Sequence, residues 1–167
     1  LILCMGWASW YDYRERRVSN EHWIVWSKPI IFIWALDLLI QAPHWSVWLT
    51  ASALLAYASG SVIGRPTFRD AKRGNRVDQI VMIWYAISIL GVVAASYRFA
   101  STTPLDVLID DASSEATLWW SYVGALFTLI VIDFAWRLRF IHGGADAKAL
   151  MWVCLLYTSD AADDQCC

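Results

Sequence analysis

Long apolar segments alternate with short polar ones along most of the chain. Four of these segments are apolar over about the 20 residues that a helix needs to cross the hydrocarbon core of a bilayer. They are Trp23–Ile40, Trp45–Ile63, Gln79–Tyr97 and Ala116–Trp136. The segments are too long for strands, and their content of Trp, Leu, Ile and Ala favours helices. The pattern predicts an all-α fold, a polytopic membrane helix bundle.

Apolar sequence also stands at both ends of this pattern. Leu1–Tyr11 indicates the inner part of a truncated first helix, and a further helix begins at Ala145 and is cut short. We therefore expect four complete spans between a truncated first and a truncated last helix. The ten residues from Cys154 to Asp163 resemble the translation of a transposase sequencing-library adapter. Such a segment is excluded from fold reasoning, so we expect one membrane-embedded domain over residues 1–153 and a non-native tail over 154–167.

Basic residues are concentrated in alternate loops. They follow the first apolar segment, fill the loop 65–76 and follow the segment that ends at Trp136, whereas the loops 41–44 and 101–115 contain neither Lys nor Arg. Twelve of the thirteen Lys and Arg residues thereby fall on one face of the predicted bundle. The positive-inside rule places that face in the cytoplasm. We expect a multi-pass protein of the plasma membrane.

Composition strengthens this interpretation. Hydrophobic residues make up 59% of the chain and charged ones 17%, against roughly 45–50% and about 25% in soluble domains. The apolar content excludes a disordered chain, and a net charge of -2 argues against a nucleic-acid-binding protein. Twelve Trp residues suggest anchors at the membrane–water interfaces. Those near the cytoplasmic ends of the spans are Trp7, Trp10, Trp23, Trp26 and Trp136, and those near the outer ends are Trp45, Trp48, Trp119 and Trp120. Membrane lipids are the expected surroundings.

Two polar clusters stand beside the membrane segments. Asp12 follows the first apolar segment, and Asp146 precedes the last one, directly after Gly143, Gly144 and Ala145. Four complete spans separate the two clusters, and an even number of spans returns the chain to the same side. We therefore expect Asp12 and Asp146 to meet at the cytoplasmic face.

A pair of carboxylates at this place suits the hydrolysis of peptides. Ionisable residues at the edge of an apolar bundle are costly and tend to be functional. Two adjacent carboxyl groups share a proton, so that one can take a proton from the attacking water while the other protonates the carbonyl oxygen or the leaving amine. Gly143 and Gly144 would let the backbone of a substrate approach closely.

The residues Gly143-Gly144-Ala145-Asp146 resemble the signature of the GxGD membrane aspartic peptidases. More narrowly, they resemble the archaeal branch of the type IV prepilin peptidases, which includes the preflagellin peptidases. Asp12, followed by a basic stretch and Asn20, is similar to the first motif of that family. The chain departs from the family at Ser19, where a Pro is usual, and at Ala145, which replaces the second Gly of GxGD.

The resemblance implies an aspartic endopeptidase with Asp12 and Asp146 as its catalytic residues. Such an enzyme removes the short basic leader of a pilin-like or archaellin-like precursor at the cytoplasmic face of the membrane. Residues of the two motifs would position the substrate: Gly143, Gly144, Ala145, Lys148, Arg16, Arg17 and Asn20. No cofactor and no metal are implied, and His22 and His44 lie too far apart in the predicted topology to form a metal site.

Other interpretations remain open. A non-enzymatic multipass protein, such as a fragment of a transporter, would need polar residues or broken helices near the membrane midplane. A GxGD protease of the presenilin type carries its first Asp within a span, whereas Asp12 stands at the edge of one. The loop 65–76 either sets the topology or binds anionic lipid headgroups. Asp133 and Arg137 are spaced to form an ion pair on one helix.

Overall fold

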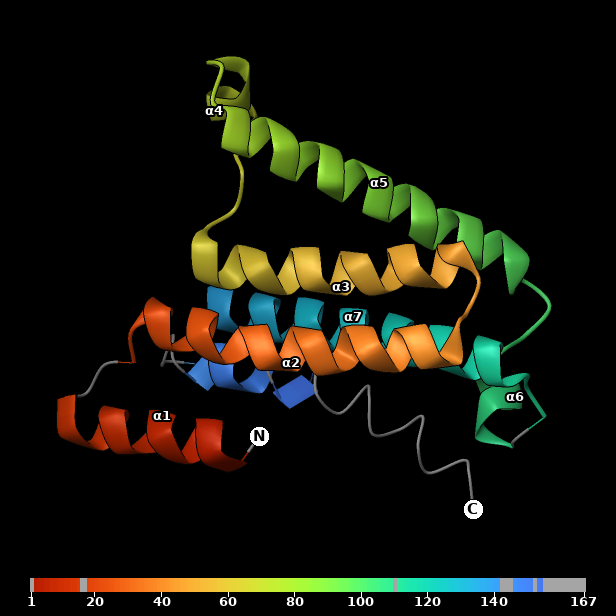
Figure 1. The fold of residues 1–167 in the computed structure, drawn as a ribbon, viewed down its shortest axis with the longest axis horizontal. Helices are drawn as coiled ribbons and strands as arrows, with labels where there is room; N and C mark the ends of the chain where they lie inside the picture. The colour runs from red at the N-terminus through yellow and green to blue at the C-terminus, as the bar shows by residue number, and fades with distance from the viewer. Residues whose placement is uncertain (1, 16–17, 110, 142–145, 152, 155–167) are drawn as a thin grey trace.

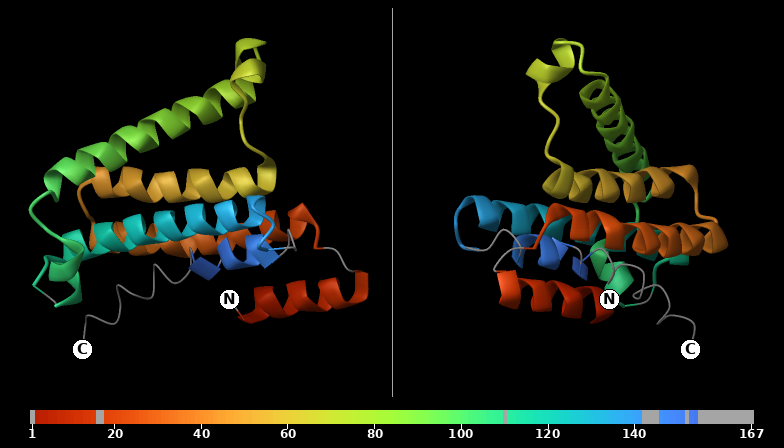
Figure 2. Two further views of the ribbon diagram at one scale, coloured as in Figure 1. Left: turned by 180° about the vertical axis from the view of Figure 1, so that it is seen from behind. Right: turned by 60° about the vertical axis from the view of Figure 1, so that its left-hand side comes forward.

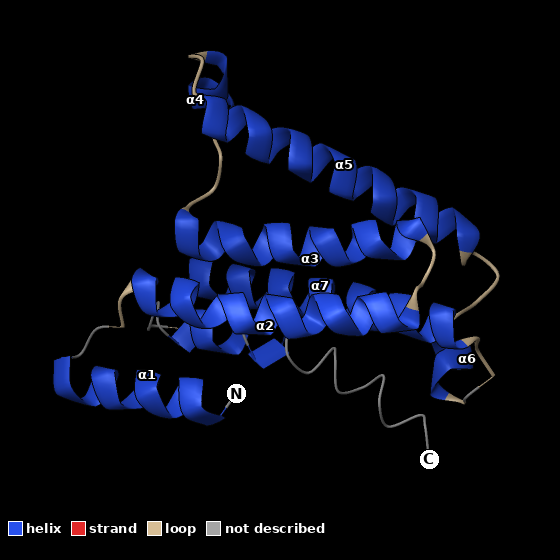
Figure 3. Cartoon of the chain, in the orientation of Figure 1, coloured by secondary structure: helices blue, strands red, loops and turns tan. Residues whose placement is uncertain are grey.

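The chain forms helices joined by loops in a computed structural model that describes residues 2–15, 18–109, 111–141, 146–151 and 153–154 (Figure 3). No strand occurs among these residues, so the prediction of an all-α fold is confirmed. The helices are α1 (Ile2–Glu15), α2 (Asn20–Gln41), α3 (Trp45–Ile63), α4 (Phe68–Lys72), α5 (Arg76–Arg98), α6 (Pro104–Leu108) and α7 (Ser114–Arg137). A further helical segment covers residues 146–151.

Three helices among the described residues are long and apolar enough to cross a membrane. They are α2 over Glu21–Gln41, α5 and α7. Their outer faces carry large exposed apolar side chains, such as Phe32 of α2, Ile83 of α5 and Phe127 of α7, and so much exposed apolar surface suits contact with lipid. Helix α3 coincides with the fourth predicted span, but the side chains of residues 61–63 are not described, and its role as a span stays a prediction.

Polar caps extend the helices beyond the predicted apolar segments. The side chains of Ser19, Asn75 and Ser113 accept hydrogen bonds from backbone N–H groups in the first turns of α2, α5 and α7. An N-cap of this kind satisfies a donor that has no partner within the helix. Each of these three helices therefore begins two or three residues before its apolar segment.

Helices α2, α3 and α7 lie side by side, and α5 crosses them obliquely (Figures 1 and 2). Helix α3 is central, because it packs against α2, α5 and α7. The end of α1, the start of α2, the end of α3 and the end of α7 lie at one end of the bundle, on the left in Figure 1. We call this the basic end, because the loop 65–76 follows α3 there. The opposite end, which carries α6 and the start of α7, is called the acidic end.

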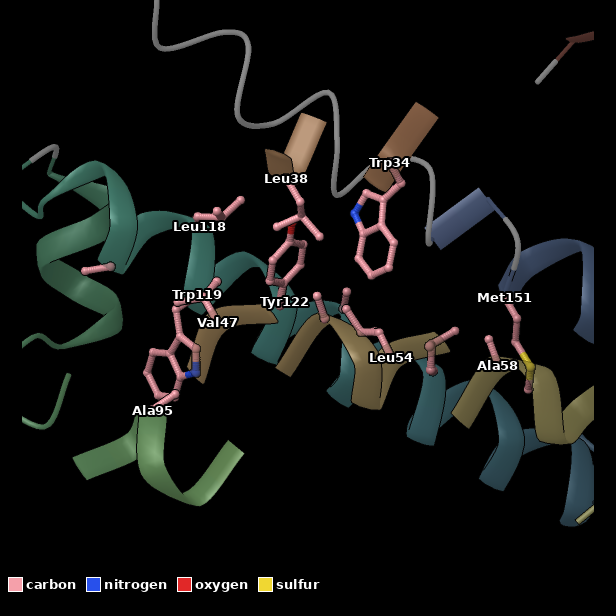
Figure 4. Close-up of a cluster of buried hydrophobic side chains, with 14 of the residues drawn as sticks. Trp34, Leu38, Val47, Leu54, Ala58, Ala95, Leu118, Trp119, Tyr122 and Met151 are labelled. Atoms are coloured by element: carbon pink, nitrogen blue, oxygen red, sulfur yellow. The ribbon is translucent and has the colours of Figure 1, made fainter. Parts of the chain in front are cut away.

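Buried side chains from α2, α3 and α7 form the core (Figure 4). Leu38 of α2, Val47 and Leu54 of α3, and Tyr122 and Leu129 of α7 are almost completely buried. Helix α3 contributes small residues as well, which let neighbouring helices approach closely. Its buried alanines are Ala51, Ala56 and Ala58.

Two of the expected interface tryptophans lie inside the bundle, so that part of the prediction is wrong. Trp23 is 1% exposed and Trp119 is 4% exposed. The ring of Trp119 stacks on Phe99 with the centroids 5.4 Å apart. Both rings belong to the buried core of the bundle. Trp7 and Trp45 are exposed, as interface anchors would be.

Candidate functional site

A cavity of about 180 Å³ at the basic end holds both predicted catalytic aspartates. Asp12 and Asp146 are 134 positions apart in the sequence, and yet both line this one cavity. The fold thus brings the two carboxyl groups to the same end of the bundle, as the even number of intervening long helices predicts. The other lining residues are Ala8, Ser9, Val18, Trp23 and Ala149.

Helix geometry gives each aspartate a neighbour with a small side chain. Ala8 precedes Asp12 by four residues in α1, and Ala149 follows Asp146 by three in the segment 146–151. Residues three or four apart share one face of a helix, so the small side chains stand beside the carboxylates on the cavity side. Larger residues at Ala8 and Ala149 would fill the space that the carboxylates face.

The carboxylates are reachable, whereas the wall behind them is apolar. Asp12 and Asp146 are both exposed, and Trp23 is buried. No described residue accepts a hydrogen bond from Trp23 Nε1. A water molecule and an extended peptide could both reach the two carboxyl groups from the open side, which is the arrangement that acid–base hydrolysis needs.

Few of the other predicted site positions can be placed. Asn20 is the first residue of α2, and Lys148 is half-buried in the helical segment 146–151. Arg16, Arg17, Gly143, Gly144 and Ala145 lie outside the described residues. Within the described part of the chain, no three His, Cys, Asp or Glu side chains come together in a way that could hold a metal ion.

A second polar cluster surrounds Asp133 near the end of α7. The buried Asp133 Oδ2 accepts hydrogen bonds from Arg65 Nη2 at 2.9 Å, Arg137 Nε at 3.0 Å and Tyr57 Oη at 3.2 Å. The predicted pair of Asp133 and Arg137 is confirmed. Arg65 and Tyr57 were not expected, because nothing in their local sequence points to a residue so far along the chain.

The environment of Arg65 favours its charged form. Burial lowers the pKa of the guanidinium, but the hydrogen bond and the negative charge of Asp133 raise it by more, so the pKa lies above the usual value. Arg65 Nη2 also donates to Tyr57 Oη at 3.3 Å, and the guanidinium stands 5.2 Å from the centre of the Tyr57 ring. The cluster joins α3, the following loop and α7.

Glu115 connects three segments at the acidic end. Its carboxylate accepts hydrogen bonds from the backbone N–H of His44 and from Arg98 Nη2, the latter at 3.3 Å. These contacts join the loop between α2 and α3, the end of α5 and the first turn of α7. They stabilise the fold at the end opposite the two aspartates.

Comparison of the chain with family models, with curated proteins and with solved structures gives no significant match. Function is therefore inferred from the residues of the chain and from their arrangement.

Proposed function

We propose that the chain is a membrane aspartic endopeptidase in which Asp12 and Asp146 form the catalytic pair. The proposal rests on one observation, that these two aspartates line one cavity although α2, α3, α5 and α7 lie between them in the sequence. The resemblance of both motifs to the archaeal prepilin peptidases adds the substrate class. The enzyme removes the basic leader of a pilin-like or archaellin-like precursor.

The proposed reaction is a general acid–base hydrolysis. The ionised carboxylate of the pair takes a proton from a water molecule, whose oxygen attacks the peptide carbonyl carbon. The protonated partner donates its proton to the carbonyl oxygen, which gives a tetrahedral gem-diol. The carboxyl group that took a proton from water then donates it to the leaving nitrogen, the other carboxylate takes a proton from one hydroxyl of the gem-diol, and the C–N bond breaks, so the pair returns to its starting state. No cofactor takes part.

The shape of the cavity suits a peptide that lies across its mouth. About 180 Å³ is less than the roughly 300–1,000 Å³ of a drug-sized ligand site, so the cavity would accept one side chain at most. The exposed positions of Asp12 and Asp146 leave the peptide backbone outside. The apolar outer faces of α2 and α7 could then hold the hydrophobic helix that follows the cleavage site in such precursors.

The proposed topology has α2, α3, α5 and α7 as four complete spans of the plasma membrane. The basic end faces the cytoplasm, because Lys and Arg favour the cytoplasmic side of a membrane protein. Helix α1 and the segment that begins at residue 146 then contribute one aspartate each from incomplete helices. Both carboxyl groups would stand at the cytoplasmic membrane surface, where the leader of a precursor is accessible.

Co-expression with a precursor tests the catalytic pair. The precursor carries a short basic leader before an apolar helix, and mass spectrometry measures the fraction that has lost the leader. We expect Asp12→Asn and Asp146→Asn each to lower cleavage by about 10²–10⁴-fold, the usual contribution of a positioned acid or base. Asp78→Asn is the matched control, because Asp78 lies in the first turn of α5 and outside the cavity.

Full cleavage by either variant would exclude the pair. A lack of cleavage by the unsubstituted chain, with the protein folded in the membrane, would count against the activity itself and favour a non-enzymatic multipass protein.

A further inference from the structure

Helices α3 and α5 are held together near the acidic end and separate toward the basic end (Figure 1). Trp84 Nε1 donates to Ser52 Oγ at 2.6 Å, and the hydroxyl groups of Ser52 and Ser88 are 3.3 Å apart. Farther along α5, Gly91 packs so closely against Leu49 that an added Cβ would collide with the Leu49 side chain. Beyond Trp84, in the direction of the basic end, the two helices diverge.

A cavity of about 230 Å³ opens where they diverge. Tyr85 Oη donates to the backbone carbonyl of Ala56 at 2.6 Å, and this is possible because Gly60 has no side chain to displace the phenol. The rings of two tyrosines and a proline and the thioether of a methionine form most of the wall, and the guanidinium of an arginine forms the rest. The lining residues are Tyr57, Arg65, Pro66, Met82 and Tyr85.

Arg65 is held in a fixed position at this cavity while its side chain stays 42% exposed. Its bonds to Asp133 and Tyr57 both start from Nη2. A guanidinium has further N–H donors at Nε and Nη1, and it matches the geometry of phosphate oxygens. An anchored arginine of this kind loses little conformational freedom when it binds an anion.

The sequence around the cavity is strongly basic. Residues 65–78 contain five basic residues and two acidic ones, a net charge of +3. All five basic residues are exposed, namely Arg65, Arg69, Lys72, Arg73 and Arg76. Helix α5, which is apolar enough to cross a membrane, begins at Arg76. A basic segment directly beside a membrane helix attracts anionic lipids.

We infer that this cavity binds an anionic phospholipid, with the headgroup phosphate on Arg65 and the first part of an acyl chain between α3 and α5. The walls of tyrosine and methionine suit an apolar chain, and the same side of α5 exposes Ile89 and Val93, at spacings of four residues beyond Tyr85, for the rest of it. A volume of about 230 Å³ holds only part of a lipid. The remainder would lie along the outer surface of α5. This site goes beyond the proposed peptidase activity and does not depend on it.

Native mass spectrometry of the full chain tests the inference. The protein is equilibrated with an equimolar mixture of phosphatidylglycerol and phosphatidylcholine, and the ratio of the two lipids that remain bound is measured. We expect phosphatidylglycerol to be enriched on the unsubstituted chain. Arg65→Gln should lower this enrichment about tenfold, because a hydrogen bond between charged groups is lost.

A second variant separates the site from the stability of the fold. Met82→Trp fills the cavity without changing any charge, and it should also lower the binding of phosphatidylglycerol about tenfold. Its matched control is Ile83→Trp on the exposed face of α5, and the control for Arg65→Gln is Arg69→Gln in the same basic loop. Both controls should change the enrichment by less than about threefold.

Two results would overturn the inference. One is an unchanged enrichment in Met82→Trp, which would show that the cavity is not the lipid site. The other is an equal loss in Arg69→Gln and Arg65→Gln, which would indicate diffuse attraction by the loop instead of a site at Arg65. If Arg65→Gln does not fold, the comparison of Met82→Trp with Ile83→Trp decides.

Discussion

Arg65 Nη2 lies 2.9 Å from Oδ2 of Asp133, and this ion pair fastens the loop after α3 to the last turns of α7. The two residues are 68 positions apart. Asp133 also accepts from Arg137 and from Tyr57, so one buried carboxylate holds groups from three parts of the fold. The contact stands at the basic end, where the two candidate catalytic aspartates also lie.

Asp133→Asn should destabilise the protein. The amide removes the negative charge that both arginines share, and the polar group at this buried position keeps fewer strong hydrogen bonds. The cost of weakening such a set is about 1–3 kcal/mol. Thermal unfolding in detergent measures it. Asp111→Asn is the control, because Asp111 is exposed in the loop before α7, and an equal loss in this control would argue against a special role of Asp133.

Gly91→Ala should force α3 and α5 apart. The added methyl group would collide with Leu49, and overpacking of this kind costs about 1–3 kcal/mol. Gly124→Ala in α7 is a matched control, because nothing lies near an added Cβ there, and the better helix propensity of Ala should stabilise it by up to about 1 kcal/mol. Leu49→Ala combined with Gly91→Ala should not recover the loss, because the added Cβ collides with the Leu49 Cβ, which alanine keeps. If Gly91→Ala and Gly124→Ala shift the unfolding midpoint in the same direction, that result would contradict a close approach of Gly91 to Leu49.

Helix α6 should weaken in acid. The Asp106 carboxylate accepts hydrogen bonds from the backbone N–H and the hydroxyl of Thr103, at 2.6 and 2.9 Å, and these bonds lower its pKa below the usual 3.8. Because the pKa in the folded state is depressed, the stabilisation is complete above about pH 3.8 and is lost as the pH falls through the lower value.

Backbone chemical shifts of Thr103 to Leu108, recorded as a function of pH, measure this change. The same titration of Asp106→Asn should show no such transition. A transition that persists in the variant would assign it to another group.

Ser9→Leu should block the cavity of the two aspartates. Ser9 is exposed and lines that cavity, so a larger apolar side chain fills the space without burying a polar group. The proposed peptidase activity is measured as loss of the leader from the precursor. We expect the rate of cleavage to fall about tenfold, because displacing a substrate by about an ångström can lower a rate by that much or more. Ser96→Leu, at an exposed position of α5, should leave cleavage unchanged, and an equal effect of both substitutions would point to general destabilisation.

The helices could be predicted from the sequence because burial in lipid or in the core requires long apolar runs. Trp45–Ile63 is both the predicted segment and the whole of α3. The predicted apolar segments begin two or three residues after the starts of α2, α5 and α7. The polar residues of a capped first turn belong to the helix but not to its apolar run. Helix α6 was not predicted either. It is five residues long and depends on the Thr103 cap and on Pro104 in its first turn, not on hydrophobicity.

The site could be predicted only where chain order determines position. An even number of long helices is sufficient to place Asp12 and Asp146 at one end, and i, i+4 spacing is sufficient to pair Asp133 with Arg137. The contact of Asp133 with Arg65 depends on how α3 packs against α7, which a single sequence does not encode in any local pattern. The burial of Trp23 and Trp119 also depends on how the helices pack. The sequence alone does not predict it, because the amphipathic indole suits a membrane interface as well as a gap between helices.

Glu115 and Asp133 stand 18 residues apart in α7, which is about five full turns, so both carboxylates lie on the same face of the helix. Each is fastened to other segments, one at each end of the bundle. At a rise of about 1.5 Å per residue they are about 27 Å apart along the axis, close to the hydrocarbon thickness of a bilayer, about 30 Å. Sliding α7 along its axis, or turning it, would break both sets of contacts together. The position of α7 relative to its neighbours is therefore fixed, and a bilayer much thicker or thinner than this spacing would have to deform around the protein.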